Sequence, residues 1–200
     1  TFNPLPAGLL EQGRTVDVLL ELENQSVCAL CVMTADGLYL FDSGADAVAE
    51  QILTAPAAKR LNGLKALHHY ASAGGFSLNN VIFDAEIAGY ILNPTANGYS
   101  IARLAGEYGI APHSLDNLLG IHVTLLEQCA VFSPLADALL AKLSDRSQMR
   151  RVTDIELPRA GVLADMETLG FELDRQGLVD YGAKLDVEIA NYQKQIYALA

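Results

Sequence analysis

The amino-acid sequence predicts an α/β fold in which helices flank a mixed sheet, with further helices at the C-terminus. Three observations lead to this prediction. Three β-rich runs fill residues 15–42. Helical patterns then alternate with short apolar runs between residues 45 and 146, which is typical of a sheet covered by helices. The last fifty residues contain helical spacing interrupted by a single short link.

The first strand is predicted over residues 15–24. Side chains alternate between the two faces of a strand. One face therefore carries Val18, Leu20 and Leu22, and the other carries Asp17, Leu19, Glu21 and Glu23. The second face is either a carboxylate platform for metal ions or a solvated face of the sheet. Two more strands are predicted within 27–42, because Asp36-Gly37 between apolar runs is a strong hairpin signal.

Helices and short strands alternate after this antiparallel start. The spacing predicts strands near 60–62 and over 81–84, and helices over 45–55, 63–75, 85–93, 101–109, 114–132 and 134–146. Asp84 and Ser100 directly precede two of these helices, so we expect them to be N-caps. Gly74-Gly75, Asn93-Pro94 and Gly109 supply helix stop signals.

The C-terminal part has a different pattern. A helix is predicted over 154–170, followed by an extended link at 171–174. From residue 175 to residue 200, apolar side chains recur at steps of three and four, which predicts a long amphipathic helix. We place a module boundary near residues 150–155.

Composition limits the classes of function. The formal net charge of −11 argues against strong DNA binding by this chain, because phosphate neutralisation by a basic face supplies much of that affinity. The basic residues fall in two small groups that we expect to be solvated helix ends: Lys59, Arg60 and Lys65, then Lys142, Arg146, Arg150 and Arg151. No signal peptide or membrane span is expected.

The cysteine and histidine residues give no site by their spacing. Cys28 and Cys31 form a C-x-x-C pair, but on a strand they point to opposite faces, and no second pair completes a zinc site. We expect them to be small buried apolar residues in a reduced compartment. Packing or surface roles are expected for the histidines, which are His68, His69, His113 and His122.

Three stretches together resemble the bacterial family A DNA polymerases, the DNA polymerase I family. The first is 78-LNNVIFDAEIAGYILNPTANGYSIARLAGEYG-109, with a strand ending in Phe-Asp, a helix, an Asn-Pro break and a helix carrying Leu-Ala-x-x-Tyr. The second is 155-IELPRAGVLADMETLGFELDRQGL-178, which is similar to the opening of that family's polymerase domain. The third is 188-EIANYQKQIYALA-200, similar to the helix that begins the thumb.

This resemblance implies a ribonuclease H-like fold of the DnaQ-type 3′–5′ exonuclease over residues 1–152, and the first helices of a polymerase domain over residues 153–200. It further implies a bacterial cytoplasmic protein that meets DNA through the full-length enzyme. Magnesium would serve the parent polymerase, and the polymerase domain of the same chain would be the partner of this piece.

Active exonuclease domains of this family hold two metal ions with four carboxylates, since divalent cations need several oxygen ligands. The resemblance places those four ligands at Leu19, Glu21, Leu67 and Cys129 of this sequence. A shift of two residues on the first strand would instead use Glu21 and Glu23. Glu127 could replace Cys129 only with a gap. At most two ligands therefore remain, and the catalytic, cofactor and metal sites are predicted to be lost.

The sequence thus predicts a DNA polymerase I piece whose exonuclease-like domain is inactive and structural. Two alternatives stay open from the residues alone. One is an active metal-dependent 3′–5′ proofreading exonuclease, and the other is a nucleic-acid-binding module.

Overall fold

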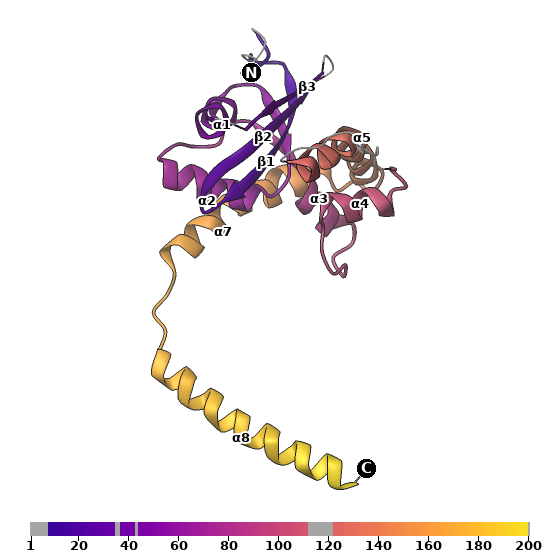
Figure 1. The fold of residues 1–200 in the computed structure, drawn as a ribbon. Coiled ribbons are helices and arrows are strands. Elements are labelled where there is room, and N and C mark those ends of the chain that lie inside the picture. Colours follow the sequence, from indigo (N-terminus) through magenta and orange to yellow (C-terminus); the bar gives the residue numbers. More distant parts are fainter. Residues whose placement is uncertain (1–7, 35–36, 43, 112–121, 200) are drawn as a thin grey trace. The chain divides into compact units, whose positions relative to one another are not determined.

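The structure is a computed structural model that describes residues 8–34, 37–42, 44–111 and 122–199. Five strands form one mixed sheet in the order β3-β2-β1-β4-β5 (Figure 1). They are β1 (Thr15–Glu23), β2 (Ser26–Thr34), β3 (Gly37–Phe41), β4 (Ala58–Leu61) and β5 (Val81–Asp84). Strands β1, β2 and β3 are antiparallel, whereas β4 and β5 run parallel to β1. The predicted mixed sheet is therefore confirmed, with the fourth strand starting two residues before the predicted one.

The hairpin signal at Ala35-Asp36 lies outside the described residues, although the strands on either side of it pair as antiparallel neighbours. The helices are α1 (Ala45–Thr54), α2 (Leu64–Gly74), α3 (Ala85–Leu92), α4 (Ile101–Glu107), α5 (Val123–Asp145), α6 (Met149–Arg151), the π-helical turn η1 (Val152–Glu156), α7 (Leu157–Leu169) and α8 (Arg175–Leu199).

Helix α5 corrects one sequence prediction. Two helices, 114–132 and 134–146, were expected on either side of Pro134, but the described part is one continuous helix over Val123–Asp145. Residues 114–121 lie outside the described part. A proline inside a helix removes one backbone hydrogen bond. Burial of the apolar face of α5 outweighs that loss, since eight of its residues are buried, among them Phe132, Leu135 and Leu139.

The core includes both faces of the central strands. The four consecutive residues Val16–Leu19 of β1 are buried, and so are Ala29–Val32 of β2. Consecutive strand residues point to opposite faces, so both faces of the sheet are covered here. Helix α5 contacts β1 and β2, and α1 packs against β2. In the described part of the chain, α5 is also the one helix long and apolar enough to cross a membrane, and its buried residues fit a core helix equally well.

The chain divides into two compact units, Thr1–Thr168 and Leu169–Ala200. The first unit holds the sheet and the helices from α1 through almost all of α7. The second consists mainly of α8, the long helix predicted from the apolar spacing. The helix predicted to begin at residue 154 belongs to a longer helical run that begins at Met149 and passes through η1. The assignment of residues 153–200 to a polymerase domain concerns sequence type and stays a prediction.

Candidate functional site

The first predicted ligand position lies inside the core. Leu19 on β1 is only 3% exposed. Glu21, two residues further, is partly exposed and its Oε2 lies 2.5 Å from Nδ1 of His122. Glu23 is exposed at the end of the strand. The expected solvated face of β1 is therefore limited to this end, because α5 covers the strand at Leu19. His122 was expected within an apolar helix but stands at the N-cap of α5.

The second position, Leu67, is on α2 and is 2% exposed. The helix begins after Gly63, whose φ of 80° lies in the left-handed region that glycine adopts without steric cost. This start turns Leu64, Leu67 and Tyr70 toward the core. Lys65, from the same Asn-x-Leu-Lys motif, points outward and binds Glu167 of α7.

The third position, Cys129, is on α5 and is 4% exposed. The neighbouring thiol of Cys31 on β2, together with burial, raises the pKa of Cys129. The described residues contain no disulfide at either position, and both cysteines are free thiols. Glu127, the alternative for this position, is exposed and lines a small hollow beside α4. It does not join the other predicted positions.

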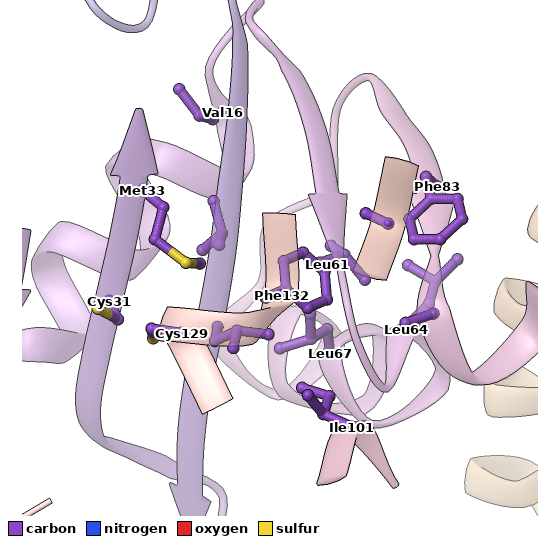
Figure 2. Packing of buried hydrophobic residues seen from close by; sticks show 14 of the residues in the cluster. Val16, Cys31, Met33, Leu61, Leu64, Leu67, Phe83, Ile101, Cys129 and Phe132 are labelled. Carbon is purple, nitrogen blue, oxygen red and sulfur yellow. The ribbon is translucent and has the colours of Figure 1, made fainter. Parts of the chain in front are cut away.

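Leu19, Leu67 and Cys129 all belong to one cluster of buried apolar residues. Figure 2 shows Cys129 beside the strands that carry Val16, Cys31 and Met33, and Leu67 in the group of side chains that includes Leu61 and Phe132. Among the residues that the structure describes, no three His, Cys, Asp or Glu side chains are placed to share a metal ion. An apolar environment of this kind opposes a bound cation.

A polar network that the sequence did not predict joins β1, β4 and α5. Arg60 donates from Nε to Oδ1 of Asp17 at 2.5 Å and from Nη2 to Oδ2 at 2.6 Å, and it also binds Asp137. Ser133 donates its hydroxyl to the same Asp17 at 2.5 Å. Both oxygens of this buried carboxylate are thus occupied by protein donors.

Lys59 and Arg60 are not solvated helix ends, as the sequence suggested, but parts of β4. Lys59 is fully buried, and its Nζ donates to the carbonyl oxygens of Ala55 and Ala57 at 2.7 and 2.8 Å. Burial lowers the pKa of Lys59 to about 8. The backbone turn after α1, which no spacing pattern specifies, supplies both acceptors. Neither cation is available to a phosphate.

Asp84 at the end of β5 caps α3, as predicted, because its Oδ1 accepts from the backbone N–H of Ile87 at 2.7 Å. Its Oδ2 accepts from the N–H of Leu64 at 2.7 Å, so the same carboxylate also caps α2. Burial raises the pKa of Asp84 to about 6, although the two N–H groups act in the opposite direction. The carboxylate therefore serves two helix N-termini, where backbone N–H groups lack partners. The predicted cap Ser100 likewise accepts from Arg103 N–H, at 3.4 Å.

A cavity of about 330 Å³ lies between α2, α3 and α7. Its walls are mostly apolar, with Tyr90 and Tyr99 in an edge-to-face pair. The two cations that line it are already paired, Lys65 with Glu167 and Arg159 with Glu156. The cavity therefore has no uncommitted positive group, within the part of the chain that the structure describes, for a nucleic-acid phosphate.

Two solved structures that resemble this chain define its fold class. NrnC from Brucella melitensis, solved with bound Mg²⁺, matches over 80% of this chain and 89% of its own, with a TM-score of 0.58 and 13% identity. The POL domain of Pol1 from M. smegmatis, solved in complex with DNA primer-template and dNTP, matches over 94% of this chain and 35% of its own, with a TM-score of 0.69 and 24% identity. These likenesses show a ribonuclease H-like α/β fold followed by C-terminal helices.

The sequence relatives are more specific. DNA polymerase I of Geobacillus stearothermophilus is 29% identical over 139 residues, which are 63% of this chain and 16% of that protein. DNA polymerase I of Caldicellulosiruptor bescii is 25% identical over 200 residues, which are 94% of this chain and 23% of that protein. No protein-family model matches the chain. The chain is therefore homologous to a segment of bacterial DNA polymerase I, and it spans less than a quarter of the length of these relatives.

Proposed function

We propose that this chain is a structural part of a bacterial DNA polymerase I, formed by a catalytically inactive exonuclease-type domain that carries the first helices of the polymerase domain. The observation that carries the proposal is the burial of Leu19, Leu67 and Cys129 in one apolar cluster. These are three of the four positions at which the family resemblance places metal ligands. In this proposal, residues 1–152 form the exonuclease-type domain and residues 153–200 form the first helices of the polymerase domain.

The chemistry of phosphodiester hydrolysis explains why these replacements matter. A metal pair activates the attacking water and stabilises the leaving oxygen, and several carboxylates are needed to hold it. A leucine offers no ligand atom. The thiol of Cys129 is not a thiolate, because burial and Cys31 raise its pKa. Glu21 alone, with His122 beside it, is insufficient for two ions.

The whole protein would extend DNA in the bacterial cytoplasm, using a primer-template, deoxynucleotides and magnesium. The M. smegmatis relative, solved with DNA primer-template and dNTP, supports this part of the proposal. Neither the catalytic chemistry nor the principal DNA contact would belong to residues 1–200. The net charge of −11 agrees with a role in which other parts of the polymerase hold the DNA.

A nuclease assay tests the proposal directly. The purified chain is incubated with a 3′-labelled single-stranded oligonucleotide and either Mg²⁺ or Mn²⁺. The Glu21→Ala and Glu23→Ala variants cover both registers of the first strand, and Glu50→Ala on the exposed side of α1 is the matched control. We expect all four proteins to release the same background of nucleotide. Metal-dependent release by the wild type that persists in Glu50→Ala but disappears in Glu21→Ala, with or without a loss in Glu23→Ala, would establish an active exonuclease and overturn the proposal.

Two further measurements separate the alternatives. An active metal site predicts that Mn²⁺ raises the melting temperature, because ligands that bind only the folded state stabilise it. The structural role predicts no rise. A nucleic-acid-binding module predicts DNA retention that falls steeply with salt. We expect no such retention.

A further inference from the structure

The helix α7 is fixed to the first unit by its contacts with α2. Its buried residues Leu157, Ala160 and Ala164 recur at steps of three and four and face the body of that unit. Gly161 lies close to the ring of His68, since a Cβ at this position would come within 3.1 Å of Cε1. The absence of a side chain at Gly161 therefore leaves room for the ring of His68 against α7.

Glu167 continues this fixed face into the last turn of α7. Its Oε1 binds Nζ of Lys65 at 2.7 Å, and its Oε2 binds Nε2 of His69 at 2.8 Å. The other ring nitrogen of His69 lies 3.2 Å from the hydroxyl of Thr168. Lys65, followed by His69, lowers the pKa of Glu167. One carboxylate thus bridges two side chains that are one helical turn apart on α2.

The described contacts of α7 with α2 end at the last turn of α7. Gly170 has a φ of 66°, the left-handed conformation that commonly ends a helix. Residues 170–174 are neither helix nor strand. The next helix has its own N-cap, because Oδ1 of Asp174 accepts from the N–H of Gly177 at 2.9 Å. Each helix is therefore terminated locally, and the compact units divide at the same place, between Thr168 and Leu169.

We propose that residues 169–174 are a flexible joint between the two compact units, and that Glu167, bound to Lys65 and His69, holds the end of α7 that precedes this joint. The module boundary predicted near 150–155 is not this joint. There, α6, η1 and α7 form a continuous helical run, and Val152 and Glu156 are buried. For a polymerase, and resting on the function proposed above, α8 is then the first polymerase-type helix that follows the joint.

Hydrogen–deuterium exchange of the full 200-residue chain tests the joint. In the wild type we expect protected amides through residues 157–168 and at least about tenfold faster exchange at 170–174, because opening free energies fall toward zero in unsupported segments. Glu167→Gln removes the charge of the bridge with little change in shape. It should speed exchange over 164–169 by about two- to tenfold, the range for two exposed ion pairs, and leave β5 and α3 unchanged.

Glu172→Gln is the matched control, because Glu172 lies in the link and makes no hydrogen bond or ion pair with any residue of the described part. It should leave exchange over 164–169 unchanged. Unbroken protection through 170–174, or equal exchange in Glu167→Gln and Glu172→Gln, would overturn the joint. Neither result bears on nuclease activity, and a positive nuclease assay would leave the joint standing, so the two proposals fail separately.

Discussion

The stability of an Asp84→Asn variant as a function of pH measures two opposing effects on one buried carboxylate. Burial disfavours the charged form of Asp84, whereas the N–H groups of Leu64 and Ile87 favour it. Asparagine keeps the shape and does not titrate. Its carbonyl can still accept from one N–H, but its NH₂ group then faces the other.

The expected size follows from the pKa of Asp84, which burial raises from an ordinary value of 3.8 to about 6. Below about pH 4 the carboxyl is protonated in both the folded and the unfolded chain. Between about pH 4 and pH 6 the folded chain retains a proton that the unfolded chain has released, so the free energy of unfolding falls as pH rises. At 1.36 kcal/mol per pKa unit, the wild type loses about 3 kcal/mol relative to Asp84→Asn between pH 4 and pH 7.

At pH 4 the two proteins differ in their free energy of unfolding because asparagine leaves one N–H group unsatisfied, which costs about 1–3 kcal/mol. The wild type should therefore be more stable than Asp84→Asn by that amount at pH 4, and the margin should vanish or reverse by pH 7. Urea denaturation at several pH values between these limits gives both curves. Glu107→Gln, on the exposed side of α4, serves as the control and should follow the wild type. A margin that is constant, or that grows as pH rises, would show that the two N–H bonds outweigh burial and would refute the reasoning.

Two further substitutions test the network and the apolar cluster. Arg60→Ala leaves buried Asp17 with Ser133 as its remaining donor. Urea denaturation should show that the free energy of unfolding falls by about 3–5 kcal/mol, the cost of breaking a buried ion pair from one side. A decrease under about 1 kcal/mol would contradict the burial of the pair. Leu67→Asp places a carboxylate in the apolar cluster and should lower the free energy of unfolding by at least about 3 kcal/mol. This loss should far exceed that of Leu163→Asp on the surface of α7, and millimolar Mn²⁺ should not restore the stability of Leu67→Asp. Recovery with Mn²⁺ would mean that ligands converge on this point.

Local signals explain which parts of the fold the sequence could predict. The caps at Asp84 and Ser100 involve an N–H only three residues away, and the amphipathic stripe of α8 is a pattern within one helix. Such features need no knowledge of the tertiary structure. The mixed sheet followed from the order of strands and helices, which limits the possible topologies.

Interactions between distant segments could not be predicted in this way. Arg60 reaches Asp17 across 43 positions, and Lys65 reaches Glu167 across 102. Arg60 looked like a solvated residue because its partners lie on other elements, whereas Lys65 is exposed near the start of α2, as expected, and only its pairing with Glu167 was missed. Helix α5 was divided at Pro134 for the same reason, since only the sheet beneath it shows why the helix continues. The positions Leu19, Leu67 and Cys129 were selected by resemblance alone, because leucine and cysteine residues do not by themselves indicate a metal site.

The buried carboxylates of this chain are held by donors from neighbouring elements of the fold. Within the described residues they are Asp17, Asp84 and Glu156. Asp17 is held by Arg60 and Ser133, Asp84 by two helix N-termini, and Glu156 by Arg151 and Arg159. Asp17 and Glu156 are paired with arginines, whereas Asp84 is held by backbone N–H groups alone and its pKa is raised by burial. Each of these carboxylates therefore joins elements of the fold, and among the described residues they do not come together with other acids, histidines or cysteines in a group of three.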